Sequence, residues 1–199
     1  MLFRSGDYAP ATELLERCLA LHRKLGAHRS SGFALGHLGQ VYHYQGQSRR
    51  AIEMLQEAIA TLQAVEHKTG IAYFLNLLGL ARFEVGDHEG ASAVYRRSLA
   101  FTSEVGYKWG IAQALIGFGA LGAAEGDQQR AVRLLAAADA LLTDIEYILP
   151  VAEKAYFDRI VETLRHSMAG NFAHMWNQGR SMSMKQAVEY ALGNQSRGR

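Results

Sequence analysis

The chain has 199 residues, 49% of them hydrophobic, so it is long enough for one domain or one array of repeats with a sizeable core. A formal net charge of only +2 excludes a strongly basic surface of the kind that binds nucleic acid. Its one cysteine, Cys18, excludes an intrachain disulfide, and no apolar run reaches the roughly 18 residues of a membrane span. We therefore expect a cytoplasmic protein that contacts neither nucleic acid nor membranes directly.

The first predicted element is a helix over residues 7–25. Leu14, Leu15 and Cys18 recur at helical spacing, which predicts one apolar face. We expect Cys18 to be a small buried residue of this face rather than a reactive thiol.

Three copies of a forty-residue unit follow, over residues 30–66, 70–106 and 110–146. A fixed period of this size is typical of stacked helical repeats, so each copy predicts a helical hairpin. A glycine that permits left-handed backbone is expected to end the first helix, and an aspartate after it is expected to cap the second. Other small residues recur where the two helices must approach closely. The recurring positions are Leu38-Gly39, Leu78-Gly79 and Phe118-Gly119; Gly46, Gly86 and Gly126; Asp87 and Asp127; and Ala51, Ala91 and Ala131.

The helix over residues 7–25 aligns with the second half of a copy, so the sequence predicts one half repeat followed by three full repeats. A repeat helix cannot bury its apolar face alone. We therefore expect this chain to be a piece of a longer protein. We also expect the N-terminal half repeat to form a homodimer, with two-fold symmetry as the commonest solution.

The period is lost after Tyr147, where three amphipathic segments follow. Ser183 with Gln186 predicts a capping box at the start of the last of them. Helices that break a repeat are typical of a cap on its exposed end. The predicted domains are therefore helical repeats over residues 1–147 and capping helices over residues 148–199.

The repeat resembles the tetratricopeptide pattern W-x2-L-G-x2-Y, followed by A-x3-F. The first copy reads Leu35-x2-Leu38-Gly39-x2-Tyr42 and then Ala51-x3-Leu55. Leucine stands at the tryptophan position in every copy, and the period of forty exceeds the usual value of about 34. The resemblance implies an all-α, right-handed α-solenoid with a C-terminal helical cap, in which the first helices line a concave groove.

The C-terminal segment carries a second resemblance. Trp176-Asn-Gln-Gly179-Arg180-Ser-Met182, followed by residues 186–192, is similar to the C-terminal end of large bacterial regulators. These proteins join a STAND-type ATPase to a tetratricopeptide region and include LuxR-type transcriptional regulators. The resemblance implies a signalling role in which the repeats serve as a sensor or interaction arm.

Catalytic motifs are absent from the sequence. It contains no Gly-Lys-Ser/Thr of a P-loop, no Gly-x-Ser-x-Gly and no His-Glu-x-x-His. The glycines 117, 119 and 122 match G-x-G-x-x-G, but they lie inside a predicted helix instead of between a strand and a helix. We therefore predict no enzymatic activity, no cofactor and no metal.

The remaining candidate site is a surface for a protein or peptide. Aromatic side chains beside polar groups are enriched at interface hot spots. An alternative that the residues leave open is a small-ligand receptor or enzyme, with a pocket between the last repeat and the cap. The predicted groove residues are Phe33, Gln40, His43, Tyr44, Tyr73, Asn76, Leu80, Phe83 and Gln113.

Overall fold

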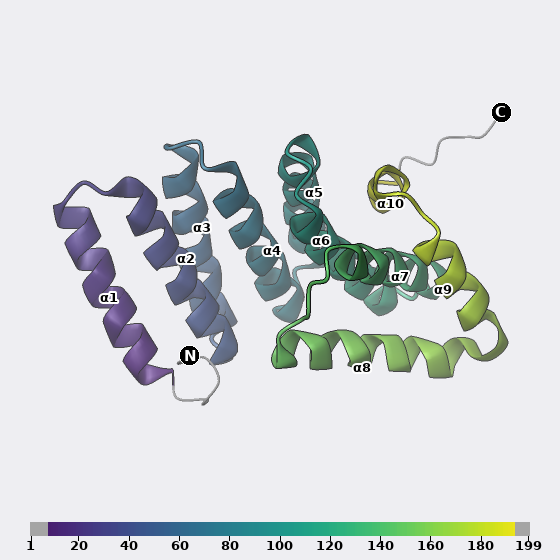
Figure 1. Ribbon diagram of the computed structural model, residues 1–199. Helices are drawn as coiled ribbons and strands as arrows, with labels where there is room; N and C mark the ends of the chain where they lie inside the picture. The colour runs from purple at the N-terminus through teal and green to yellow at the C-terminus, as the bar shows by residue number, and fades with distance from the viewer. Residues whose placement is uncertain (1–7, 194–199) are drawn as a thin grey trace. The chain divides into compact units, whose positions relative to one another are not determined.

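The computed structural model describes residues 8–193, and every regular element among them is helical (Figure 1). Consecutive helices pack as antiparallel pairs, which confirms the predicted all-α, tetratricopeptide-like fold. The first five helices are α1 (Ala9–Lys24), α2 (His28–Tyr44), α3 (Ser48–Gln63), α4 (Lys68–Glu84) and α5 (His88–Glu104). The others are α6 (Lys108–Ala124), α7 (Gln128–Asp144), α8 (Val151–Met168), α9 (Phe172–Arg180) and α10 (Met184–Ala191), with a 3₁₀ turn, η2 (Ala169–Asn171), before α9.

The chain forms two compact units, residues 1–101 and 102–199, and the boundary lies inside α5. The predicted boundary between residues 147 and 148 falls within the second unit, so the division into repeats and cap stays a prediction. Residues 1–7 and 194–199 of those predicted domains lie outside the described residues.

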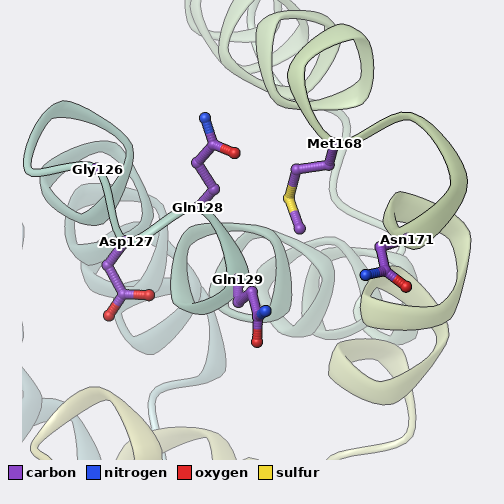
Figure 2. A pocket seen from close by; sticks show the side chains of 6 residues that line it. All are labelled: Gly126, Asp127, Gln128, Gln129, Met168 and Asn171. Carbon is purple, nitrogen blue, oxygen red and sulfur yellow. The ribbon is translucent and has the colours of Figure 1, made fainter.

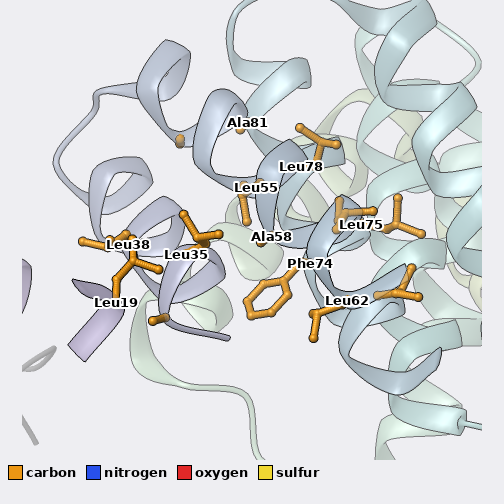
Figure 3. Close-up of a cluster of buried hydrophobic side chains, with 14 residues drawn as sticks. Leu19, Leu35, Leu38, Leu55, Ala58, Leu62, Phe74, Leu75, Leu78 and Ala81 are labelled. Carbon is orange, nitrogen blue, oxygen red and sulfur yellow. The ribbon is translucent and has the colours of Figure 1, made fainter. Parts of the chain in front are cut away.

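The core of the first unit is a cluster of leucines around one phenylalanine (Figure 3). The ring of Phe74 on α4 is fully buried among side chains of α2 and α3. It lies against Gly36 of α2, where an added Cβ would overlap the ring. The labelled members are Leu19, Leu35, Leu38, Leu55, Ala58, Leu62, Phe74, Leu75, Leu78 and Ala81.

The recurring glycines of the first helices are sites of close helix approach, as predicted. A Cβ on Gly39 would lie 2.7 Å from Cγ of Leu55 in α3. A Cβ on Gly119 would lie 2.7 Å from Cγ of Leu135 in α7, and one on Gly79 would overlap the ring of Tyr95. Glycine in a helix interior costs roughly 1 kcal/mol of helix propensity, and the close contact of the two helices offsets that cost.

Left-handed backbone occurs at every twentieth residue from 26 to 146. This confirms the predicted glycine turns inside each hairpin and adds a second set between hairpins. At each turn a backbone N–H reaches back to the preceding helix, as from His67 to the Leu62 carbonyl (3.0 Å). The positive-φ residues of this series are Gly26 (64°), Gly46 (72°), Glu66 (52°), Gly86 (81°), Gly106 (65°), Gly126 (84°) and Glu146 (52°).

The predicted helix caps are present. The Asp87 carboxylate accepts a hydrogen bond from the Gly90 N–H (2.9 Å), and the Asp127 carboxylate accepts one from the Arg130 N–H (3.2 Å). The capping box of Ser183 starts α10. Each cap satisfies a backbone donor that the helix itself leaves open.

Helix α1 covers its apolar residues less completely than its counterparts do. The Cys18 side chain is only half-buried, whereas Ala58, Ser98 and Ala138 at the equivalent positions are fully buried. The expectation of a buried cysteine is therefore met only in part, because α1 packs on α2 without a helix on its other side among the described residues.

In the second unit the C-terminal helices pack on the last hairpin, as a cap does. Helices α8 and α10 both contact α6, and α8, α9 and α10 contact α7. As a result α6 is buried almost all round, including Ile116 and Ala120 on the face that the repeat pattern assigns to the groove.

The Glu66→Gly substitution should raise the free energy of unfolding by about 0.5–1 kcal/mol. Glu66 has a φ of 52°, a conformation that an L-residue with a Cβ adopts at a cost of roughly 1–2 kcal/mol. Urea denaturation measures the change. The matched Gly46→Ala variant, at a φ of 72°, should be destabilised, and a loss of stability in Glu66→Gly would contradict the interpretation of the turn.

Candidate functional site

The candidate site begins with one face of α2. Phe33, His37, Gln40 and Tyr44 are spaced by four, three and four residues, which places them in one row along the helix. All four are half-buried. His37 was not among the predicted groove residues, although its spacing from Phe33 and Gln40 would have placed it there.

Gln40 links this row to α4. Its amide Nε2 donates to the hydroxyl oxygen of Tyr73 (3.1 Å) and to that of Tyr44 (3.4 Å). Its Oε1 lies 3.3 Å from Nδ1 of His37, so the amide contacts three neighbouring side chains. The network fixes the positions of two half-exposed tyrosines. Binding of a partner would therefore cost less side-chain entropy, because these rings are already ordered.

Aromatic contacts with the buried ring of Phe74 also hold the side chains of this network in place. The Tyr73 ring packs edge-on against Phe74 at 5.1 Å between centroids, and Phe33 packs against Phe74 at 5.8 Å. The His37 ring contacts both Tyr73 and Phe74 of α4, with centroid distances of 6.4 Å and 5.7 Å. Because Phe74 is fully buried in the core, the half-exposed rings of Phe33, His37 and Tyr73 pack against a side chain that cannot move freely.

His43 lies at the end of α2, beside Tyr44, and joins the ends of three helices. Its Nδ1 is 3.1 Å from Oε2 of Glu84 on α4, and the Ser48 hydroxyl of α3 donates to the same oxygen (2.9 Å). Burial raises the pKa of the Glu84 carboxyl, but the nearby His43 imidazole and the hydrogen bond from Ser48 outweigh burial and hold the pKa below its ordinary value.

The Glu84→Gln substitution should lower the free energy of unfolding by a few tenths of a kcal/mol at neutral pH, as is typical of partly exposed pairs. A lowered carboxyl pKa contributes stability above its ordinary range, and this contribution is lost as the pH falls through the lowered value. The difference from the parent chain should therefore disappear in acid, as measured by urea denaturation across pH. Ser48→Ala should show a smaller loss with the same pH dependence, whereas a difference that persists at low pH would exclude the carboxylate as its source.

Three of the other predicted groove residues lie on α4, and the fourth lies on α6. Asn76 is buried in α4, with 7% of its surface exposed, and Leu80 is half-buried. The Phe83 ring stacks on His88 at 5.2 Å. Gln113 lies in the second unit.

Gln113 contacts the cap. Its Nε2 donates to Oε2 of Glu153 on α8 (3.2 Å). Burial raises the pKa of Glu153, and this hydrogen bond offsets part of the rise. The C-terminal helices therefore engage a side chain that the repeat pattern assigns to the groove.

The residues of the C-terminal resemblance form the seam between α7 and the last two helices. The Arg133 guanidinium of α7 donates to Gln178 Oε1 (2.9 Å) and to the Tyr190 hydroxyl (3.2 Å). Arg180 pairs with Asp139 of α7. At Gly179 the α9 backbone lies so close to α7 that an added Cβ would overlap the carbonyl oxygen of Arg133.

The Gly179→Ala substitution should therefore separate α9 from α7 and lower the free energy of unfolding by about 1–3 kcal/mol, as overpacking does. Gly170→Ala is the matched control in the same region, because an added Cβ there meets no atom within 4 Å. Hydrogen exchange of the α9 amides reports the separation directly. Equal stability of the two variants would contradict the close contact.

Two open pockets lie between the last hairpin and the C-terminal helices. One, of about 440 Å³, is lined by polar side chains of the first turn of α7, with Met168 and Asn171 opposite (Figure 2). The other, of about 460 Å³, has a floor that includes Leu142 and Phe157 and a charged rim that includes Lys154. Both volumes are in the range of ligand sites.

The polar side chains that line these two pockets are exposed or half-buried, and those of the second include Asp139, Glu146, Lys154 and Asp158. Over residues 8–193, the buried polar residues other than glycine are Ser31, Asn76, Ser98 and Thr102, and none belongs to α7–α10. In the same range, no three His, Cys, Asp or Glu side chains are placed to hold a metal ion. No helix in the described part of the chain is long and apolar enough to cross a membrane.

Comparison with known proteins agrees with the repeat geometry. No curated protein matches the chain. A family model described as the tetratricopeptide repeat matches residues 1–64, which include α1, α2 and α3. Residues 1–64 are therefore a tetratricopeptide repeat region.

Proposed function

We propose that the chain is a non-catalytic interaction or sensor module that binds a protein or peptide through the face of α2 and α4. Tetratricopeptide repeats generally mediate protein interactions, and the family comparison gives no catalytic family. The observation that carries the proposal is the Gln40 network, which holds Tyr44 and Tyr73 half-exposed on one face. Fixed aromatic rings beside polar groups are typical of interface hot spots.

The wider context of the proposal is a larger bacterial signalling or transcriptional regulator, in which this chain is the C-terminal tetratricopeptide arm. The support is the similarity of the segment from Trp176 to Leu192 to the ends of such regulators. The contacts of Arg133 with Gln178 and Tyr190 are a structural reason for those residue types. In this context the chain acts in the cytoplasm and contacts neither nucleic acid nor membranes directly.

A small-ligand receptor or an enzyme is the second candidate, and the pockets of about 440 and 460 Å³ favour it. The first is lined mainly by Gln128, Gln129, Asp127 and Asn171, none of which is buried. Ligand sites normally combine an apolar wall with a few fixed polar groups, and this pocket shows mainly the second feature. The second pocket has both features, but its charged side chains are not buried, so nothing fixes them as a ligand site would. The interaction module is the better supported function because the matched family generally mediates protein interactions.

The Tyr73→Ala/Phe83→Ala double variant tests the proposal. A photoreactive phenylalanine at position 73 first captures the partner from the source cell, and the crosslinked peptide is identified and synthesised. The double variant should then bind that peptide at least about 30-fold more weakly than the parent chain, because truncating a buried aromatic hot spot typically costs roughly 2 kcal/mol or more.

Val85→Ala is the control, since Val85 is an exposed apolar residue near the end of α4. Its affinity for the peptide should match that of the parent chain. Unchanged affinity in the folded double variant would show that the partner binds another surface.

A further inference from the structure

Three aromatic rings and one carboxylate gather where the start of α6 meets the turn before α8. The Trp109 ring lies 5.7 Å from Tyr107 and 6.0 Å from Tyr147, measured between centroids. Burial raises the pKa of the Tyr147 hydroxyl, and the nearby Glu153 carboxylate of α8 raises it further. These four residues are here called the aromatic–carboxylate cluster.

The cluster is open to solvent. Tyr147 is 38% exposed, and Tyr107, Trp109 and Glu153 are half-buried. The ring planes of Trp109 and Tyr147 are inclined at 70°, so the two rings do not close on each other as a flat stack. Tyr147 also lines the open pocket of about 460 Å³, so there is room beside its ring for the rest of a bound molecule.

Glu153 has no basic partner among the described residues. Its carboxylate accepts a hydrogen bond from the neutral amide of Gln113 (3.2 Å). The adjacent base, Lys154, pairs instead with Asp158 (2.5 Å). Burial raises the pKa of Glu153, and the bond from Gln113 offsets only part of the rise. A bound cation would therefore stabilise this half-buried carboxylate.

The surrounding charges favour the same sign of ligand. Lys108, which lies between Tyr107 and Trp109 in the sequence, is paired with Asp144 (2.5 Å). Glu146, in the turn before α8, is exposed. This turn also follows the C-terminal end of α7, where the helix dipole is negative.

The repeat does not need these aromatic residues. Arg29 and Thr69 stand at the position of Trp109 in the earlier copies, and His67 stands at the position of Tyr107 in the copy before. Helices α2 and α4 therefore begin without this pair of rings. The two rings are a feature of the last repeat alone and not a requirement of the hairpin.

We propose that the aromatic–carboxylate cluster binds an alkylated ammonium cation. The face of an aromatic ring attracts a cation that lies within about 6 Å of its centroid, and Glu153 supplies the opposite charge. Ring faces accept hydrogen bonds poorly, which suits an ammonium whose hydrogens are replaced by methyl groups better than a guanidinium with its five donors. The cluster shares no residue with the surface in the proposed function, so its failure leaves the Tyr73 experiment unaffected.

The test compares choline with 3,3-dimethylbutanol, the neutral analogue in which carbon replaces the nitrogen. The chain has two tryptophans, so Trp176→Phe leaves Trp109 as the only fluorescent indole. Titration of this full-length variant should give a dissociation constant for choline at least about ten-fold lower than that for the alcohol, because only choline gains the cation–π contact. Calorimetry on the unmodified chain should give the same order of affinity.

Variants of the chain test the residues. Glu153→Gln keeps the shape of the side chain and removes its charge, so it should weaken choline binding at least about three-fold and leave the alcohol unaffected. Tyr147→Leu should weaken choline binding more than that of the alcohol. Glu125→Gln is the matched control, since this exposed acid follows the other end of α6, and it should bind choline like the parent chain.

A second arm distinguishes the two sources of such a cation. A short peptide with one trimethyl-lysine is titrated beside choline, and the same peptide with unmodified lysine is its control. Tighter binding of the trimethyl-lysine peptide than of choline would assign the cation to a methylated protein. Tighter binding of choline would assign it to a small molecule, and both results support the ammonium chemistry.

Four results would overturn the proposal. The first is a titration in which choline causes no saturable change in Trp109 fluorescence. The second is equal affinity for choline and the neutral alcohol. The third is choline binding that Glu153→Gln leaves unchanged or that Glu125→Gln weakens equally. The fourth is binding of the unmodified lysine peptide as tight as that of both choline and the trimethyl-lysine peptide.

Discussion

Direct contact between the two helices of each hairpin is the constraint on which the repeat depends. Gly39 and Gly119 leave space for Leu55 and Leu135, and no side chain larger than a hydrogen atom fits there without movement of a neighbour. The short distance between the helix axes in turn lets the leucines of adjacent helices interdigitate at the density of a close-packed core. The recurrence of glycine at these positions follows from this contact, because each copy must place a small residue where the two helices meet.

Much of the fold could be predicted because it is encoded locally. The period, the turn glycines and the caps at Asp87 and Asp127 depend on residues within one hairpin, and each left a direct signal in the sequence. The turns at Glu66 and Glu146 could not be predicted, because glutamate is no signal for left-handed backbone. There the packing of the flanking helices dictates the conformation, and the residue tolerates it.

The candidate site was only partly predictable, since its contacts cross from one helix to another. The resemblance to the tetratricopeptide pattern assigned Phe33, Gln40 and Tyr44 to the groove, but the bond of Gln40 to Tyr73 depends on how α2 packs on α4. The C-terminal seam is a similar case: Arg133 lies forty-five residues from Gln178, and no local pattern connects the two. His37, by contrast, could have been predicted, because its spacing from Phe33 and Gln40 places it in the same row.

The even spacing of the turns restricts how this chain can change in length. A single residue inserted into a helix rotates everything after it by about 100° relative to its neighbours, which turns the buried stripe toward water. Because turns fall at every twentieth residue from 26 to 146 and the two helices of a hairpin have different sequences, the change with the least disturbance is gain or loss of a whole hairpin of forty residues. The natural unit of growth of this array is therefore the hairpin.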